Sequence, residues 1–146
     1  MKDTDMEQTV RSVIRRMTAS SVMNLAFARN LIREVEKKAQ EMGVKAVVAV
    51  SDAAGRPVAI ECMDGAYIGS FDVALNKTFT SVAFQMSTAE LGKLASPGGS
   101  LYGIQNTNDG KIVIFGGGEP LYVDDVLIGA IGVSGGTAEQ DTALGA

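Results

Sequence analysis

The sequence predicts one α/β domain of the α+β kind, in which a five-stranded, mainly antiparallel sheet is flanked by helices. A length of 146 residues is that of one ordinary domain and is enough to bury a single core. Short runs rich in β-branched residues are joined by tight turns, which is typical of hairpin-linked antiparallel strands. Segments with apolar residues at helical spacing lie before, between and after these runs, so the predicted order is ααββααβββα.

The N-terminal segment predicts a helical arm that precedes the domain. Residues 4–17 place Met6, Val10 and further apolar side chains at helical spacing. We therefore divide the chain into an N-terminal helical arm over residues 1–19 and a domain over residues 20–146. The apolar stripe of the arm needs a packing partner, in the same subunit or in another.

A long amphipathic helix opens the domain, and a β-hairpin follows it. Ser20 or Ser21 is the expected N-cap of the helix, and Gly43 suits the left-handed residue that ends it. VKAVVAVSD (44–52) and RPVAIECMD (56–64) flank an Ala-Ala-Gly turn. This pattern predicts two antiparallel strands.

Two helices and a long loop come next. SFDVALNKTFTSVAFQM (70–86) is apolar around much of its circumference, which predicts a buried helix. Ser87 and Glu90 have the spacing of a capping box, which begins a short helix. The segment 96–110 is rich in Gly, Ser and Asn and lacks a regular pattern. Loops of this length often fold over a site, so we expect a lid there.

Three more strands and a helix complete the chain. The strands are KIVIFGGG (111–118), EPLYVDD (119–125) and VLIGAIGVSGG (126–136). Thr137 and Gln140 then have the T-x-x-Q spacing of a capping box, which predicts a C-terminal helix that begins after Thr137.

Composition excludes several classes of function. The formal net charge is −4, and the basic residues alternate with acids on predicted helices, which argues against a nucleic-acid partner. No apolar run approaches the about 20 residues that span a bilayer, and the N-terminus lacks the apolar stretch of a signal peptide. We therefore expect a cytoplasmic protein with no membrane partner. The chain has no histidine and one cysteine, which excludes Ser-His-Asp and Cys-His catalysis and leaves no predicted metal site.

The stretch GAIGVSGGTAEQD (129–141) joins a strand, a glycine turn and a helix start. Ser134, Gly135 and Gly136 precede the cap at Thr137, and glycine lets main-chain N–H groups converge at the positive end of a helix. Such a turn binds a carboxylate, a propionate or a phosphate. The alternative is a structural corner whose N–H groups bond to water or to capping side chains. The glycine spacing matches neither a dinucleotide fingerprint nor a P-loop.

Lys77 is the single cation of its predicted helix. A buried lysine has a lowered pKa and can act as a base or bind an anion. The alternatives are a side chain that reaches the surface, or one that pairs with Asp72 or Asp64.

Further acids are candidates beside the glycine turn and in the first hairpin. Glu139 and Asp141 lie in the first turn of the C-terminal helix, where acids favour the helix dipole. They are also placed to bind a cation or to act as acid and base. Asp52 begins a turn, where its side chain is suited to local hydrogen bonding.

Taken in series, these motifs resemble the GlcG/HbpS family, also called the haem-degrading-domain family, which includes the C-terminal domain of PduO-type cobalamin adenosyltransferases. The resemblance covers about residues 20–146 and rests on VVAVSDAAGRPVA, the helix with Lys77, and the PGG, GGEPL and GAIGVSGGTAEQD motifs. It implies an α/β domain with a five-stranded antiparallel sheet, assembled as a dimer or larger homo-oligomer, and haem binding in some members. Residues of this chain that fall on recurrent positions of the family are Asp52, Met63, Asp64, Lys77, Ser134, Gly135, Gly136, Thr137 and Glu139. Gly116 and Asp125 stand where family patterns often carry Pro and Gly.

Four functions remain open, one of which is purely structural: the domain assembles a ring or docks on a larger enzyme. The first is an accessory binding protein of bacterial-type metabolism, whose small anionic ligand meets Ser134 to Thr137 beneath the 96–110 loop, with Lys77, Glu139, Asp52 and Asp64 as further ligand-binding candidates. The second is a haem-binding protein, in which Met, Tyr, Cys, Lys or a hydroxyl replaces histidine at the iron, or only the propionates are held. The third is an enzyme on small carboxylates, with Lys77 or Glu139 as acid and base and the glycine-turn N–H groups at an oxyanion.

Overall fold

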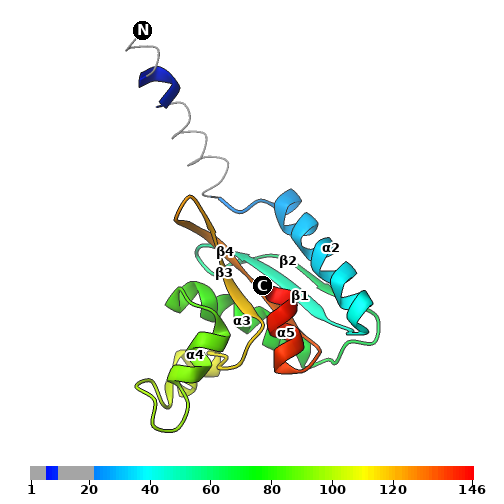
Figure 1. Cartoon of the computed structure of the whole chain (residues 1–146), viewed down its shortest axis with the longest axis vertical. Coiled ribbons are helices and arrows are strands. Elements are labelled where there is room, and N and C mark those ends of the chain that lie inside the picture. The colour runs from blue at the N-terminus through cyan, green and yellow to red at the C-terminus, as the bar shows by residue number, and fades with distance from the viewer. Residues whose placement is uncertain (1–5, 10–21) are drawn as a thin grey trace.

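Helices cover both faces of a four-stranded sheet in the computed structural model, which describes residues 6–9 and 22–146 (Figure 1). Residues 6–9 are helical, and the rest of the predicted arm lies outside the described residues. The elements in chain order are α2 (Leu25–Met42), β1 (Val47–Asp52), β2 (Pro57–Cys62), α3 (Ser70–Phe84), α4 (Thr88–Leu94), the 3-10 turns η2 (Ile104–Asn106) and η3 (Asn108–Gly110), β3 (Gly118–Val123), β4 (Val126–Ser134) and α5 (Ala138–Gly145).

The sheet has the strand order β2-β1-β4-β3, and every neighbouring pair is antiparallel. Strands β1 and β4 form its centre, with Val47 opposite Ser134 and Val50 opposite Ile131. The last strand in the chain is therefore a central one. The glycine turn leaves the sheet from the end of this strand.

The expected fifth strand over residues 111–118 is wrong, although its apolar residues are buried as a strand would require. Ile112 is 4% exposed and Val113 is 9% exposed. The Val113 N–H donates to Thr80 Oγ1 at 3.0 Å, and the same hydroxyl lies 3.3 Å from the carbonyl oxygen of Lys111. A side chain of α3 thus satisfies the backbone that a neighbouring strand would otherwise pair.

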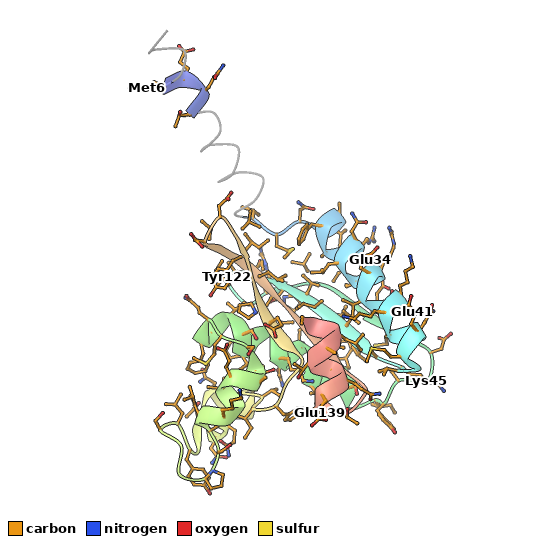
Figure 2. The ribbon with its side chains drawn as sticks, viewed as in Figure 1. Met6, Glu34, Glu41, Lys45, Tyr122 and Glu139 are labelled. Carbon is orange, nitrogen blue, oxygen red and sulfur yellow. The ribbon has the colours of Figure 1, made fainter. Side chains whose placement is uncertain are left out.

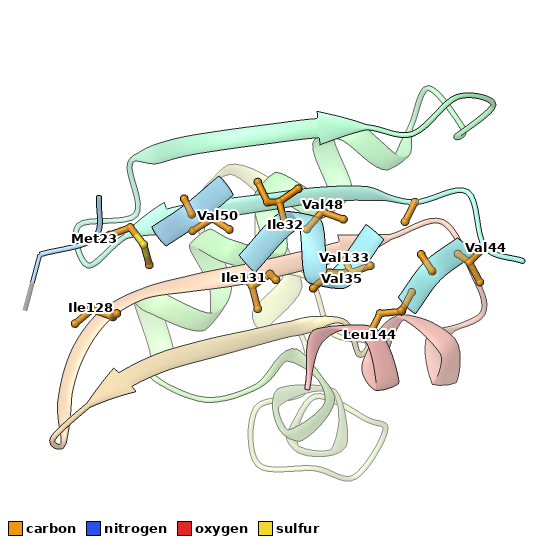
Figure 3. Close-up of a cluster of buried hydrophobic side chains, with 13 residues drawn as sticks. Met23, Ile32, Val35, Val44, Val48, Val50, Ile128, Ile131, Val133 and Leu144 are labelled. Atoms are coloured by element: carbon orange, nitrogen blue, oxygen red, sulfur yellow. The ribbon is translucent and has the colours of Figure 1, made fainter. Parts of the chain in front are cut away.

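Strand β1 is buried on both faces, because a helix covers each face. Val48 and Val50 lie in the larger core cluster with Ile32 of α2 and Leu144 of α5, as Figure 3 shows. Val47 and Ala49 pack on the opposite face with Ala74 of α3. This double burial explains the nearly unbroken β-branched run in the sequence.

A glycine in β4 lets α3 approach the sheet closely. A Cβ atom at Gly132 would lie 2.1 Å from the carbonyl oxygen of Ala74. The backbones of β4 and α3 therefore pack directly against each other at this point. Any residue larger than glycine would force them apart.

The helix ends follow local signals, with one correction. Asn24, not Ser20 or Ser21, caps α2: its side chain accepts a hydrogen bond from the Phe27 N–H at 2.8 Å. Gly43 ends α2 in the left-handed conformation, with φ of 72°, as predicted. The side chain of Ser87 accepts from the Glu90 N–H at 3.1 Å, so the predicted start of α4 is confirmed.

Candidate functional site

The glycine turn between β4 and α5 is held by acceptors of the protein itself. The Gly136 N–H donates to Asp141 Oδ1 at 2.8 Å, and the Thr137 N–H donates to Gln140 Oε1 at 2.9 Å. The Thr137 hydroxyl in turn accepts from the Gln140 N–H, which completes the predicted capping box. Two of the N–H groups expected to face an anion are thus already bonded.

Lys77 lies at the centre of a buried network. Its side chain is 0% exposed, and its Nζ lies 3.3 Å from Asp141 Oδ2, whose own side chain is 4% exposed. The same Nζ donates to the Val133 carbonyl at 2.5 Å and lies 5.0 Å from the centroid of the Phe115 ring. The expected alternatives, a surface position or a pair with Asp72 or Asp64, are therefore wrong. Burial lowers the pKa of Lys77, and the charge and hydrogen bond of Asp141 oppose that change.

The network lies beside β4 at a point just before the first residue of β3. The Val133 N–H donates to the Gly117 carbonyl at 2.9 Å, and β3 starts at the next residue, Gly118, opposite Gly132. Lys77 therefore supplies the donor that the Val133 carbonyl would otherwise lack. Asp141 joins this lysine to the Gly136 N–H, so one carboxylate ties α3, β4 and α5 together.

Four other predicted residues lie in four separate places. Asp52 bonds within the first hairpin, where burial opposes its ionisation but hydrogen bonds from the Arg56 and Ala54 N–H groups and the Arg56 guanidinium hold its pKa below the ordinary value. The Ser134 hydroxyl, 3.2 Å from that of Ser70, is buried. Asp64 lines an open hollow of about 390 Å³ with Glu36, Gln40, Cys62 and Met63. Glu139 is exposed at the start of α5.

An open hollow of about 280 Å³ lies beside the glycine turn. Its lining comes from Gly43, Val44, Lys45, Gly65, Tyr67, Gly135, Gly136 and Gln140, without any residue of the 96–110 loop. The loop expected as a lid is therefore not its cover. Gly135 and Gly136 are the predicted site residues that reach this space.

Lys45 is the cation of this hollow, and sequence reasoning missed it. It lies on the connection between α2 and β1, and Figure 2 shows it on the surface, as it does Glu139 on α5. A Cβ atom at Gly65 would lie 3.2 Å from Lys45 Nζ, so the side chain crosses a bare glycine. Tyr67 lines the same space and is 75% exposed. The signal in the sequence was weak, because Lys45 and Gly135 are 90 positions apart.

Glu119 of the edge strand β3 and Glu90 of α4 are neighbouring acids. Burial, and then the charge of Glu90, raise the pKa of Glu119 above its ordinary value.

Within the described residues, no three Cys, Asp or Glu side chains gather in a way that would hold a metal ion. In the same part of the chain, no helix has the length and apolar character needed to cross a bilayer.

The fold and the glycine turn define a class of small α/β domains, and comparison with known proteins identifies it. Residues 23–146 match the family model described as haem degrading protein HbpS-like. The chain belongs to this HbpS-like family, which confirms the resemblance found in the sequence.

Three relatives illustrate the match. The chain is 44% identical over 124 residues to the "uncharacterized 15.0 kDa protein in dhaT-dhaS intergenic region" of Citrobacter freundii, with 85% of this chain and 87% of that protein covered. It is 40% identical over 111 residues to the corrinoid adenosyltransferase PduO of Salmonella typhimurium, covering 76% of this chain but only 33% of PduO. A crystal structure of a PduOC:heme complex superimposes with a TM-score of 0.82 at 36% identity, covering 85% of this chain and 90% of that one.

Proposed function

We propose that this protein binds a small anionic molecule in the hollow beside the glycine turn, as an accessory protein of bacterial-type metabolism. The observation that carries the proposal is the position of Lys45. Its ammonium group borders a hollow of about 280 Å³, and no ion pair or hydrogen bond of that group is found among the described residues. An unpaired cation beside polar main chain is suited to an anion.

The main-chain N–H groups of the glycine turn contribute less to ligand binding than the sequence predicts. The Gly136 and Thr137 N–H groups already have acceptors, so Lys45 and the side chains of Tyr67 and Gln140 take their place as ligand-binding groups. Lys77 acts indirectly, since Asp141 joins it to the turn. The amine of Lys77 is completely buried and has three partners, which argues against a catalytic role for it. This favours a binding protein over an enzyme that uses Lys77.

Thermal unfolding with phosphate, malonate and propionate, each against chloride at equal ionic strength, tests the proposal. A ligand at ten times its Kd stabilises by about 1.4 kcal/mol and raises Tm by about 3–6 °C for a domain of this size. Lys45→Gln should remove that shift. Lys93→Gln, an equal charge change at an exposed position of α4, should retain it. No shift with any anion, or equal shifts in both variants, would contradict the proposal.

Haem is the second candidate, because a relative 36% identical was solved as a PduOC:heme complex. The chain has no histidine, and in the lining of this hollow the exposed phenol of Tyr67 is a ligand type known in haem proteins. The hollow of about 280 Å³ is too small to enclose a porphyrin, so this candidate requires haem to bind on the exposed surface around Tyr67. Lys45 would hold a propionate there, and haem would supply redox chemistry. Hemin titration should give a saturable Soret band that Tyr67→Phe shifts. A band that is unchanged in Tyr67→Phe argues against this residue as the ligand.

Self-association is part of the same proposal. Ile68 is 97% exposed and Tyr67 is 75% exposed, and neighbouring exposed apolar side chains often mark a contact surface. Light scattering should find a mass that is a multiple of 15.2 kDa. A monomer at micromolar concentration would contradict it.

A further inference from the structure

The hollow beside the glycine turn contains one net positive charge. Lys45 is the only ionisable cation in its lining, and no acid lines it. The nearest buried charges, Lys77 and Asp141, lie 3.3 Å apart and compensate each other. Asp64 adjoins Gly65 in the chain and Glu139 adjoins Gln140, so further charges close by in the sequence are negative.

Three side chains in the lining of the hollow can donate hydrogen bonds to a ligand, namely those of Lys45, Tyr67 and Gln140. Gln140 Oε1 accepts from the Thr137 N–H, and this fixes the side-chain amide with its two Nε2 hydrogens free to donate. The Tyr67 hydroxyl and the Lys45 ammonium have no hydrogen bond to the described residues. These three groups suit the two oxygens of one carboxylate and leave a second anionic group without a cation.

Size and polarity limit the ligand further. The hollow has about 280 Å³, below the range of about 300–1,000 Å³ typical of pockets for drug-sized ligands. Only Val44 and the Tyr67 ring add apolar side-chain surface, and Val44 is 5% exposed. A long alkyl chain would therefore find little surface to cover.

We infer that this site selects short carboxylates of single negative charge over dianions such as phosphate and dicarboxylates. The inference rests on the proposed function and adds its charge selectivity. A dianion brings a second charge into a site that has one cation, and it gives up hydration for which the site offers no second partner.

Propionate and malonate form a matched pair for the test, because they differ by one carboxylate in place of a methyl group. Calorimetry or amide chemical shifts at pH 7.5 and constant ionic strength should show propionate binding at least about tenfold more tightly than malonate or phosphate, a factor that corresponds to about 1.4 kcal/mol. Tyr67→Lys places a second cation at an exposed position of the lining and should reverse the preference toward malonate. Tyr67→Gln is its neutral control: loss of the phenol should weaken the binding of both acids, but propionate should still bind more tightly than malonate.

The outcomes separate this inference from the proposed function. Malonate or phosphate binding as tightly as propionate, with loss of binding in Lys45→Gln, overturns the charge selectivity and leaves the site in place. A preference that Tyr67→Lys does not change also overturns it, because the lining charge would not be what selects. No binding of any of these acids overturns both.

Discussion

Replacing Lys77 by Met removes the cation of the buried network while keeping most of the apolar stem. The carboxylate of Asp141, whose side chain is 4% exposed, would stay buried without its counter-ion. Only the Gly136 N–H would still donate a hydrogen bond to it. The Val133 carbonyl would lose the donor that now lies 2.5 Å away. Removal of one partner of a buried ion pair costs about 3–5 kcal/mol, which lowers Tm by about 6–20 °C for a domain of this length.

Urea or thermal unfolding followed by circular dichroism measures this loss. Lys93→Met changes the same residue type at an exposed position of α4 and should alter the free energy of unfolding by less than about 0.5 kcal/mol. The double variant Lys77→Met with Asp141→Leu should be less destabilised than the sum of the single variants by about 1–3 kcal/mol, because no unpaired charge remains. A Lys77→Met protein within about 1 kcal/mol of the wild type would refute the structural role and return Lys77 to the list of functional amines.

Three further predictions concern other parts of the domain. Glu119→Gln should raise the free energy of unfolding more at pH 7 than at pH 4. Burial and the charge of Glu90 raise the pKa of Glu119 in the folded protein above its value in the unfolded chain. The wild type therefore loses stability as the pH rises from the unfolded pKa to the folded pKa, whereas the amide variant has no such loss. Equal effects at both pH values would contradict this. Asn24→Ala removes the cap of α2 and should cost about 1 kcal/mol in urea unfolding. Gly132→Ala should cost about 1–3 kcal/mol because its Cβ meets the Ala74 carbonyl, whereas Gly69→Ala, which enters open space, should unfold like the wild type.

Local patterns predicted most of the secondary structure. The Thr137 and Gln140 capping box, the Ser87 cap and the Gly43 stop each depend on residues within a few positions, and each is confirmed. The hairpin of β1 and β2 has the same character, since a short turn joins its strands. Such signals need no knowledge of the tertiary fold.

The errors came from interactions between distant residues. Residues 111–118 have the composition of a strand, but Thr80, about 30 positions earlier, bonds to their backbone and holds them against α3. The acid that pairs with Lys77 is 64 positions away in the sequence, so the acids nearer in the chain, Asp72 and Asp64, are not its partners. Lys45 reaches the glycine turn only because β1 and β4 pair in the centre of the sheet. Periodicity within a short window cannot reveal such contacts.

The central position of β4 has a consequence for the order of events during biosynthesis. Helix α2 and the β1–β2 hairpin leave the ribosome before β4, so one side of β1 has no hydrogen-bonding partner until residues 126–134 appear. Until then, the β-branched run of β1 is an open edge on which a nascent chain can aggregate. We expect chaperone demand to be concentrated in that interval and to end when β4 inserts between its two neighbours.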